Sequence, residues 1–185
     1  MAQRLKEQFL RCVTGPVFPI PTPFSADGSV DVPGLEQYVD FLVDAGARTL
    51  MVTVGTSRFD VLTTEEMHLV NKTVCQAVAG RAVVIVTTPT TGPTSQAVAF
   101  ARHAADCGAD AILGVYPDRY YSDEQVYGYF HALAQAAPIG VMIHLKAMLP
   151  GRGGLGAGVP YAPDLVNRLA GIENMDANME RFNRR

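Results

Sequence analysis

Stretches with apolar residues at helical spacing alternate along this chain with short apolar runs of strand length. One helical stretch, for example, places Leu35, Tyr38, Val39 and Leu42 on the same face. Apolar runs that directly follow such stretches are typical of strands buried in a parallel sheet. The pattern predicts helices between six strands, which are expected at residues 13–19, 49–54, 82–86, 111–115, 140–144 and 172–179.

Two nearly identical turns mark the passage from helix to strand. Residues 44–47 are Asp-Ala-Gly-Ala and residues 106–109 are Asp-Cys-Gly-Ala, and an apolar run follows each of them closely. Glycine suits the left-handed backbone that ends many helices. The repeated order of helix, tight turn and strand predicts parallel strands wrapped by helices. In such folds the functional groups gather at the carboxyl ends of the strands.

Polar residues at the predicted helix starts support this interpretation. Asp31 is placed to cap the first complete helix, and residues 63–66 and 122–125 fit capping boxes. Thr94 or Ser95 is expected to cap the helix that ends near the second turn.

The chain length bears on which parallel-sheet architecture is present. Residues 1–185 contain no linker-like composition, so the sequence predicts a single domain. Six strands suit either an open doubly wound sheet or part of a (β/α)8 barrel, which typically takes about 250 residues. Length favours the open sheet. The motifs described below favour an α/β fold of the (β/α)8 TIM-barrel type, with only about the first six strands in this chain.

The composition is that of a packed globular protein, with 48% hydrophobic residues and a net charge of −3. Such a chain has no basic field to hold nucleic acid or an anionic membrane, and neither is expected as a partner. Residues 1–10 lack the apolar core of a signal peptide. Cys12, Cys75 and Cys107 form no CxxC pair and are predicted to be reduced thiols in a cytoplasmic protein.

Polar residues at two predicted strand ends are candidates for a functional site. Gly55-Thr56-Ser57 offers hydroxyls and backbone N–H groups that suit a small carboxylate, although an ordinary helix-capping loop would look the same. His144 either transfers protons or merely closes its strand. In an extended backbone Lys146 would point the same way as His144, as a Schiff-base nucleophile or as a solvated loop lysine.

Two other patterns favour structural interpretations. Residues 151–156 match GxGxxG, but a dinucleotide fingerprint joins a strand directly to a helix, and here several residues intervene. A loop is therefore predicted, with a nucleotide-binding open sheet as the alternative. His68, His103 and His131 lie on predicted helices without partners at metal-ligand spacing, so neither a metal nor a cofactor is expected.

Taken in order, segments over about residues 13–180 resemble the dihydrodipicolinate synthase / N-acetylneuraminate lyase family, whose members are class I aldolase-type lyases on a (β/α)8 barrel. Residues 15–24 look like the family's first strand and Thr-Pro-Phe turn. Residues 54–66 are similar to its GTTGE segment, which in the family binds the carboxylate of pyruvate or a related 2-oxo acid. Residues 108–111 and 116–121 look like its GAD and PPYY segments. Each motif alone is weak, but their combined order and spacing are specific.

The chain departs from the family pattern at three places. Arg58 begins the Arg-Phe-Asp that replaces the usual Gly-Glu, and it could add a second grip on an acid substrate. His144 stands at the position of the family's catalytic tyrosine. Met179 stands where the family's Schiff-base lysine is expected, and a thioether cannot form an iminium.

Three explanations of Met179 compete. The chain is a partial or altered version of a longer enzyme, or a short protein that has lost the chemistry, or an enzyme in which Lys146 supplies the amine. The resemblance implies a homo-oligomeric lyase for a 2-oxo acid or sugar-acid substrate, and the alternative is a catalytically inactive binding or scaffold relative. Catalysis is expected from His144 and Lys146. The residues expected to bind the substrate are Thr56, Ser57, Arg58 and Tyr120.

Overall fold

A parallel sheet of six strands forms the centre of the molecule in the computed structural model, which describes residues 12–117, 119–150 and 158–176. The strand order is β1-β2-β3-β4-β6-β8, and every neighbouring pair is parallel. The strands of this sheet are β1 (Val17–Pro19), β2 (Thr49–Val52), β3 (Val83–Thr87), β4 (Ala111–Gly114), β6 (Gly140–Ile143) and β8 (Met175–Asp176).

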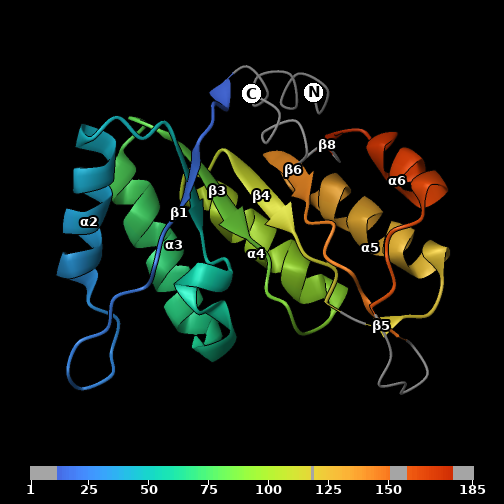
Figure 1. Cartoon of the computed structure of the whole chain (residues 1–185), viewed down its shortest axis with the longest axis horizontal. Helices are drawn as coiled ribbons and strands as arrows, with labels where there is room; N and C mark the ends of the chain where they lie inside the picture. The colour runs from blue at the N-terminus through green and yellow to red at the C-terminus, as the bar shows by residue number, and fades with distance from the viewer. Residues whose placement is uncertain (1–11, 118, 151–157, 177–185) are drawn as a thin grey trace.

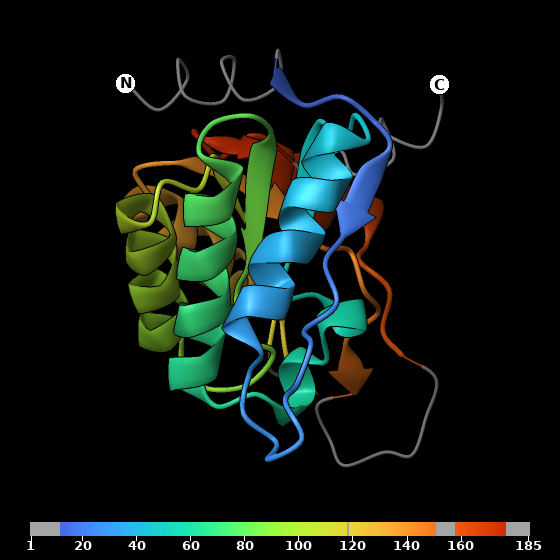
Figure 2. The same ribbon diagram turned by 90° about the vertical axis from the view of Figure 1, so that its left-hand side faces the viewer.

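Five helices connect these strands and lie side by side in chain order across Figure 1. Seen from the side of α2, the first helices stand in a row with β1 at the edge of the sheet (Figure 2). Sequential parallel strands joined by helices build the first part of a (β/α)8 barrel, as the sequence predicts. The helices are α2 (Val32–Asp44), α3 (Thr64–Val78), α4 (Thr94–Asp106), α5 (Asp123–Ala136) and α6 (Pro163–Ala170).

Both faces of the central strands are apolar, which explains why the strands read as continuous hydrophobic runs. Leu50, Val84 and Ile112 pack against the helices in the main core. On the opposite face, Ile85 and Leu113 belong to a second buried cluster. This second face is the inner side of the barrel wall.

The two repeated turns take the predicted conformation. Gly46 follows α2 with a φ of 98°, and Gly108 follows α4 with a φ of 88°. An L side chain rarely adopts this backbone, so glycine allows the chain to leave each helix and enter the next strand without strain.

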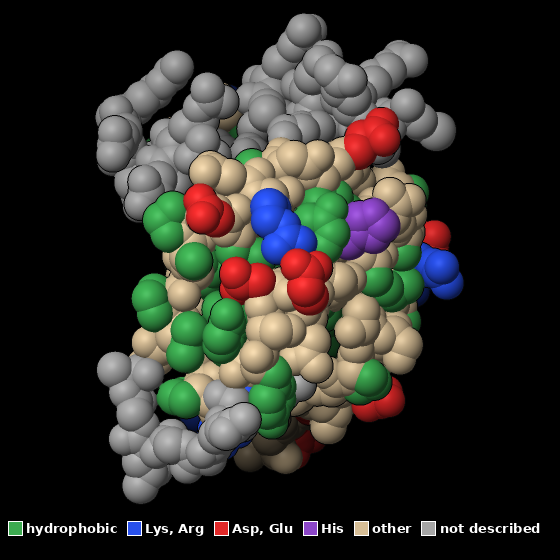
Figure 3. Space-filling model, turned by 90° about the vertical axis from the view of Figure 1, so that its right-hand side faces the viewer, with side chains coloured by type: hydrophobic (Ala, Val, Ile, Leu, Met, Phe, Trp, Pro, Cys, Tyr) green, Lys and Arg blue, Asp and Glu red, His purple; other side chains and the backbone are tan. Residues whose placement is uncertain are grey.

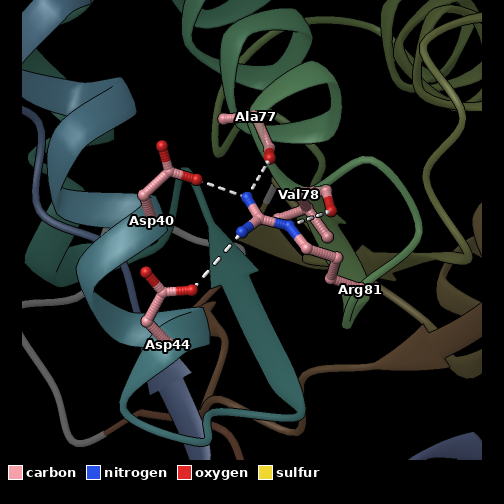
Figure 4. A network of polar contacts seen from close by, with 5 residues as sticks. All are labelled: Asp40, Asp44, Ala77, Val78 and Arg81. Carbon is pink, nitrogen blue, oxygen red and sulfur yellow. Dashed lines mark hydrogen bonds and ion pairs between the residues drawn. The ribbon is translucent and has the colours of Figure 1, made fainter.

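Arg81 ties the start of β3 to two helices (Figure 4). Its guanidinium donates to the Asp40 carboxylate and to the carbonyl of Ala77, and its Nε donates to the carbonyl of Val78 at 3.2 Å. A second ion pair reaches Asp44, in the first repeated turn, at 3.6 Å. Because the Arg81 side chain is 40% exposed, solvent screens these ion pairs and their main role is geometric.

Three of the predicted helix caps are present. Asp31 accepts a hydrogen bond from the N–H of Gly34 at 3.0 Å. Thr63 and Glu66 form the reciprocal capping box of α3. Ser122 caps α5 by accepting from the N–H of residue 125 at 3.3 Å, without the reciprocal half of a box among the described residues.

The prediction for the start of α4 is wrong. Pro93 is the N-cap residue, and Thr94 already belongs to the helix, so neither the Thr94 nor the Ser95 hydroxyl caps it. The carbonyl of Pro93 accepts the first helical hydrogen bond, from the N–H of Gln96 at 2.9 Å. A β-region proline fits this position because its missing N–H is not needed there.

The first strand is shorter than predicted. Thr14 exchanges two hydrogen bonds with the hydroxyl of Thr49, donating its N–H at 3.3 Å and accepting at 2.7 Å. A side chain therefore replaces the ladder there, and β1 starts at Val17. The last strand starts at Met175 rather than at residue 172, and residues 177–179 lie outside the described residues.

A second, two-stranded parallel sheet was not predicted. β5 (Arg119–Tyr120) pairs with β7 (Leu149–Pro150), and an Arg119 guanidinium nitrogen donates to the carbonyl of Pro150 at 2.9 Å. This pair joins the loop after β4 to the loop after β6 on the carboxyl side of the main sheet. The GxGxxG segment after β7 lies outside the described residues.

The face over α5 and α6 carries separated charges rather than a continuous basic patch (Figure 3). Arg168 on α6 pairs with Glu124 on α5 at 2.8 Å and lies over the ring of Tyr127, 4.8 Å from its centroid. In the described part of the chain, no helix is long and apolar enough to cross a membrane.

Candidate functional site

The carboxyl ends of the strands meet at one edge of the sheet because neighbouring strands are in register. Thr53 follows β2, Thr87 ends β3, Val115 follows β4 and His144 follows β6. The register places Thr53 level with Thr87, and Val115 level with His144. Because Thr87 pairs with Leu113, the second pair lies two residues further along the sheet. By the alternation of strand side chains, Thr87, Val115 and His144 project to the inner face and line the mouth of the barrel wall. Thr53 is the exception, because its backbone is left-handed and its hydroxyl contacts Asn71 of α3.

A tight loop after β2 carries three of the predicted substrate-binding residues. It starts as a 3-10 turn, η1 (Gly55–Ser57). Ser57 is completely buried, and its hydroxyl donates to the carbonyl of Ile20 and accepts from the N–H of Val54 at 3.2 Å. The carbonyl of Ser57 accepts from the Thr22 hydroxyl at 2.8 Å. Ser57 therefore anchors this loop to the chain that leaves β1.

Thr56 and Arg58 are exposed, in contrast to Ser57. Arg58 has a left-handed backbone with a φ of 57°, which ends η1 and begins the second 3-10 turn, η2 (Phe59–Val61). The first N–H groups of a helical turn have no carbonyl partner within that turn. The loop thus presents one hydroxyl, a guanidinium and turn amides that suit an acid group.

Tyr120 lies on β5, half-buried, at the same side of the sheet. Its hydroxyl donates to Oδ1 of Asp123 at 2.9 Å. This hydrogen bond, with a minor contribution from burial, raises the pKa of Tyr120. The residue is therefore a neutral phenol whose orientation is set by the start of α5.

His144 continues the hydrogen bonding of β6 beyond the strand's last residue, because its N–H donates to the carbonyl of Gly114 at 2.9 Å. Its side chain is half-buried. Burial, and after it the charge of Lys146, lowers the pKa of His144. The imidazole is therefore neutral near pH 7 and able to accept a proton.

The backbone at Lys146 turns instead of extending. The N–H of Lys146 donates to the carbonyl of His144 at 2.8 Å, which closes a three-residue turn. The expectation that the two side chains point the same way along a strand is therefore wrong, because the strand has ended at Ile143. Lys146 is exposed, yet its charge still acts on the imidazole.

The structure thus gathers the predicted residues into two groups at the mouth. Thr56, Ser57 and Arg58 follow β2, whereas His144 and Lys146 follow β6. Three strand spacings of about 4.8 Å separate β2 from β6, or roughly 14 Å along the sheet. The two groups therefore lie apart along the carboxyl edge of the sheet.

A set of buried hydroxyls at the mouth was missed by the sequence analysis. The hydroxyl of Thr88 accepts from the N–H of Val115 at 2.9 Å, and the Tyr129 hydroxyl donates to the carbonyl of Val115 at 2.8 Å. Burial raises the pKa of Tyr129 to about 12, so it stays neutral. The sequence signal that could have predicted these hydroxyls is the pair of consecutive threonines, Thr87 and Thr88, at the end of the apolar run of β3.

Two cavities lie at the opposite, amino edge of the sheet. One of about 140 Å³ borders Phe18 and Ala47, and one of about 510 Å³ borders Val83 and Asp110. Asp110 accepts from the N–H of Val84 at 2.8 Å, and burial raises its pKa. The aspartate of the GAD segment therefore has a structural role, remote from the predicted chemistry.

Two histidines that looked isolated in the sequence form a pair. The ring centroids of His68 on α3 and His103 on α4 are 4.0 Å apart, and Sγ of Cys107 lies 3.4 Å from Nε2 of His103. Nothing in the sequence indicated this pair, because the two residues come together only through the packing of neighbouring helices. In the described residues, however, no group of three ligands could hold a metal ion.

The half-buried His68 predicts acid sensitivity. Burial, and after it His103, lowers the pKa of His68 below 6.5 in the folded chain. Below pH 6.5 the unfolded chain therefore binds more protons than the folded one, so stability is complete above this pH and falls as the pH is lowered. We expect His68→Phe to reduce the difference between urea midpoints at pH 7.5 and pH 5.5, whereas the exposed-site variant His131→Phe serves as the control. An equal pH dependence in His68→Phe and the parent would contradict this.

Parallel strands wrapped by helices, with hydroxyl, imidazole and amine groups at their carboxyl edge, define the class of barrel proteins that carry their sites at this face. Residues 13–178 match the model of the dihydrodipicolinate synthetase family, and the chain belongs to this family.

Curated relatives agree with this assignment. The chain is 34% identical over 163 residues to a 4-hydroxy-tetrahydrodipicolinate synthase of Cyanothece sp., covering 86% of this chain and 52% of that protein. It is 36% identical to the corresponding enzyme of Synechocystis sp., with 86% and 51% covered. The chain spans about half the length of these relatives.

Solved structures extend the similarity. N-acetylneuraminate lyase from Mycoplasma synoviae superimposes with a TM-score of 0.73 at 27% identity, covering 86% of this chain and 52% of that one. The prophage protein YagE of E. coli K12, solved in complex with pyruvate, gives a TM-score of 0.74 at 28% identity, with 85% and 50% covered. The partial TIM-barrel fold predicted from the sequence is thereby confirmed.

Proposed function

We propose that this chain carries part of a lyase site that acts on a 2-oxo acid or sugar acid through a Schiff base. The main support comes from His144, whose imidazole is half-buried at the carboxyl edge. Its pKa is lowered by burial and by the charge of Lys146. A neutral base next to an amine is the arrangement that imine formation needs. The loop after β2 supplies acid-binding groups across the mouth.

The covalent step assigns a role to each of these groups. The Lys146 amine adds to the 2-oxo carbon, and the carbonyl oxygen takes up two protons and leaves as water, so that an iminium forms. His144 accepts the proton that the attacking nitrogen loses and returns it to the oxygen, and solvent supplies the second proton.

Substrate binding is assigned to the other wall of the mouth. The exposed Thr56 hydroxyl and the Arg58 guanidinium hold the carboxylate. Ser57 contributes its hydroxyl only if a ligand displaces the contact with Ile20. Tyr120, fixed by Asp123, offers its phenol oxygen to the distal part of a substrate.

Reductive trapping tests this function directly. The purified chain is incubated with pyruvate and sodium borohydride, and the modified residue is located by peptide mass spectrometry. We expect an adduct on Lys146 that is lost in Lys146→Met, whereas Lys72→Met, a change on the exposed side of α3, keeps it. If no lysine carries an adduct, Schiff-base catalysis by this chain is excluded.

A second candidate is a non-catalytic binding relative of the family. It is favoured by the exposed loop position of Lys146 and by Ser57, whose hydroxyl is already engaged within the chain. Calorimetric binding of pyruvate without any trapped adduct would select this candidate over the lyase.

A further inference from the structure

Thr53, at the end of β2, has a backbone that β-branched residues rarely adopt. Its φ is 55°, and it is completely buried. A left-handed threonine persists only where its surroundings hold it, and such strain gathers at functional sites. Thr53 lies two residues before Gly55, so its backbone sets the direction in which the candidate acid-binding loop leaves the sheet.

Hydroxyl groups add to the backbone ladder between β2 and β3 where β2 ends. The N–H of Val83 donates to the carbonyl of Arg48 at 2.9 Å, and a parallel ladder repeats such bonds every second residue. By this pattern, and by the pairing of Val52 with Val86, the N–H of Thr87 faces the carbonyl of Val52. The same N–H lies 3.4 Å from the hydroxyl of Thr53, and the Thr87 hydroxyl donates to the Val52 carbonyl at 3.1 Å. Side-chain hydroxyls therefore join the last hydrogen bonds between these two strands.

Asn71 completes this arrangement from α3. Asn71 is completely buried, and its side-chain oxygen Oδ1 accepts from the hydroxyl of Thr53 at 3.2 Å. The same hydroxyl lies 2.7 Å from the carbonyl of Val52, so its single proton is shared between these two acceptors.

We propose that Asn71 and Thr53 are positioning residues for the loop at Gly55-Thr56-Ser57. Asn71 accepts from the Thr53 hydroxyl, this contact holds Thr53 in its left-handed conformation, and this conformation aims the loop at the barrel mouth. Ser57 fixes the other end of the loop through Ile20. The loop is thus clamped at both ends. Its role toward an acid ligand rests on the proposed function, whereas the clamp itself does not.

Amide hydrogen exchange measured by NMR tests the clamp without any ligand. The N–H of Ser57 donates to the carbonyl of Val54 at 2.8 Å and reports the loop geometry. We expect Asn71→Leu and Thr53→Val to speed its exchange about tenfold relative to the amides of β4, which corresponds to one lost hydrogen bond. Thr53→Ser, which keeps the hydroxyl, is expected to restore the parent rate.

Thr73→Val is the matched control, because Thr73 is another buried polar residue of α3. It is expected to leave the relative exchange of Ser57 unchanged. A uniform increase at Ser57 and β4 in Asn71→Leu would reduce Asn71 to a residue of general stability. An unchanged Ser57 rate in both Asn71→Leu and Thr53→Val would overturn the proposal.

Pyruvate affinity, measured by calorimetry, adds the ligand readout. We expect Asn71→Leu to weaken pyruvate binding about tenfold and Thr73→Val to leave it unchanged. Equal affinity in Asn71→Leu and the parent would contradict the role of the clamp in binding. If the parent chain binds no pyruvate, the proposed function fails, while the exchange rates still decide whether the clamp exists.

Discussion

Replacing Phe130 by alanine is expected to lower the free energy of unfolding by about 3–5 kcal/mol. Phe130 on α5 is completely buried, packs edge-on against Tyr129 with ring centroids 5.0 Å apart, and lies against Gly114 of β4. Removing its ring leaves a cavity between α5 and the sheet, below the mouth. Urea unfolding followed by circular dichroism measures the loss.

Phe41→Ala is the matched control for this prediction. Phe41 lies on α2, another helix of the same layer, but its side chain is 65% exposed. We expect its replacement to change the stability by no more than about 0.5 kcal/mol. Similar losses in the two variants would show that the layer of helices over the sheet is not arranged as described.

Substitutions at Ser57 and Thr56, which are neighbours in the loop after β2, are expected to have different effects on stability. Ser57→Ala removes a buried hydroxyl that serves both the Ile20 carbonyl and the Val54 N–H. Leaving these groups unpaired is expected to cost about 1–3 kcal/mol of stability. Thr56→Val alters only an exposed side chain and is expected to change the stability by less than about 0.5 kcal/mol.

Ligand binding is expected to show the reverse pattern for Thr56. Under the proposed function, Thr56→Val weakens pyruvate binding about tenfold or more, because a hydrogen bond to a charged carboxylate is lost. Thermal unfolding and calorimetry on the same preparations separate the two effects. A Thr56→Val variant with the parent's affinity would remove this hydroxyl from the site, and a Ser57→Ala variant with the parent's stability would show that the anchor is not needed.

The family of this chain is established, whereas its Schiff-base reaction is a proposal. The match over residues 13–178 establishes the family, and the relatives are about twice as long as the matched region. The sequence comparison with the family pattern predicts its lysine position at Met179, outside the described residues, so the amine in the proposed mechanism comes from Lys146. The trapping experiment therefore tests whether Lys146 supplies the amine.

The sequence by itself determined the order of helices and strands, because this order depends on local signals. Apolar periodicity located the elements, and the left-handed Gly46 and Gly108 and the capping box at Thr63 confirmed where helices end and begin. The sequence also placed His144 and Gly55-Thr56-Ser57 at strand ends. The carboxyl ends of parallel strands share one edge, so these residues were expected at the same side of the sheet.

Only the tertiary structure decided which of these groups are available and which are occupied. Ser57 and Thr56 are adjacent and chemically alike, yet Ser57 is anchored to residue 20 of the chain after β1 and Thr56 faces solvent. The pairing of His68 with His103 and the link between Asn71 and Thr53 also join residues from different elements. No local pattern encodes such contacts, because they arise from how helices pack on strands that are far apart in the sequence.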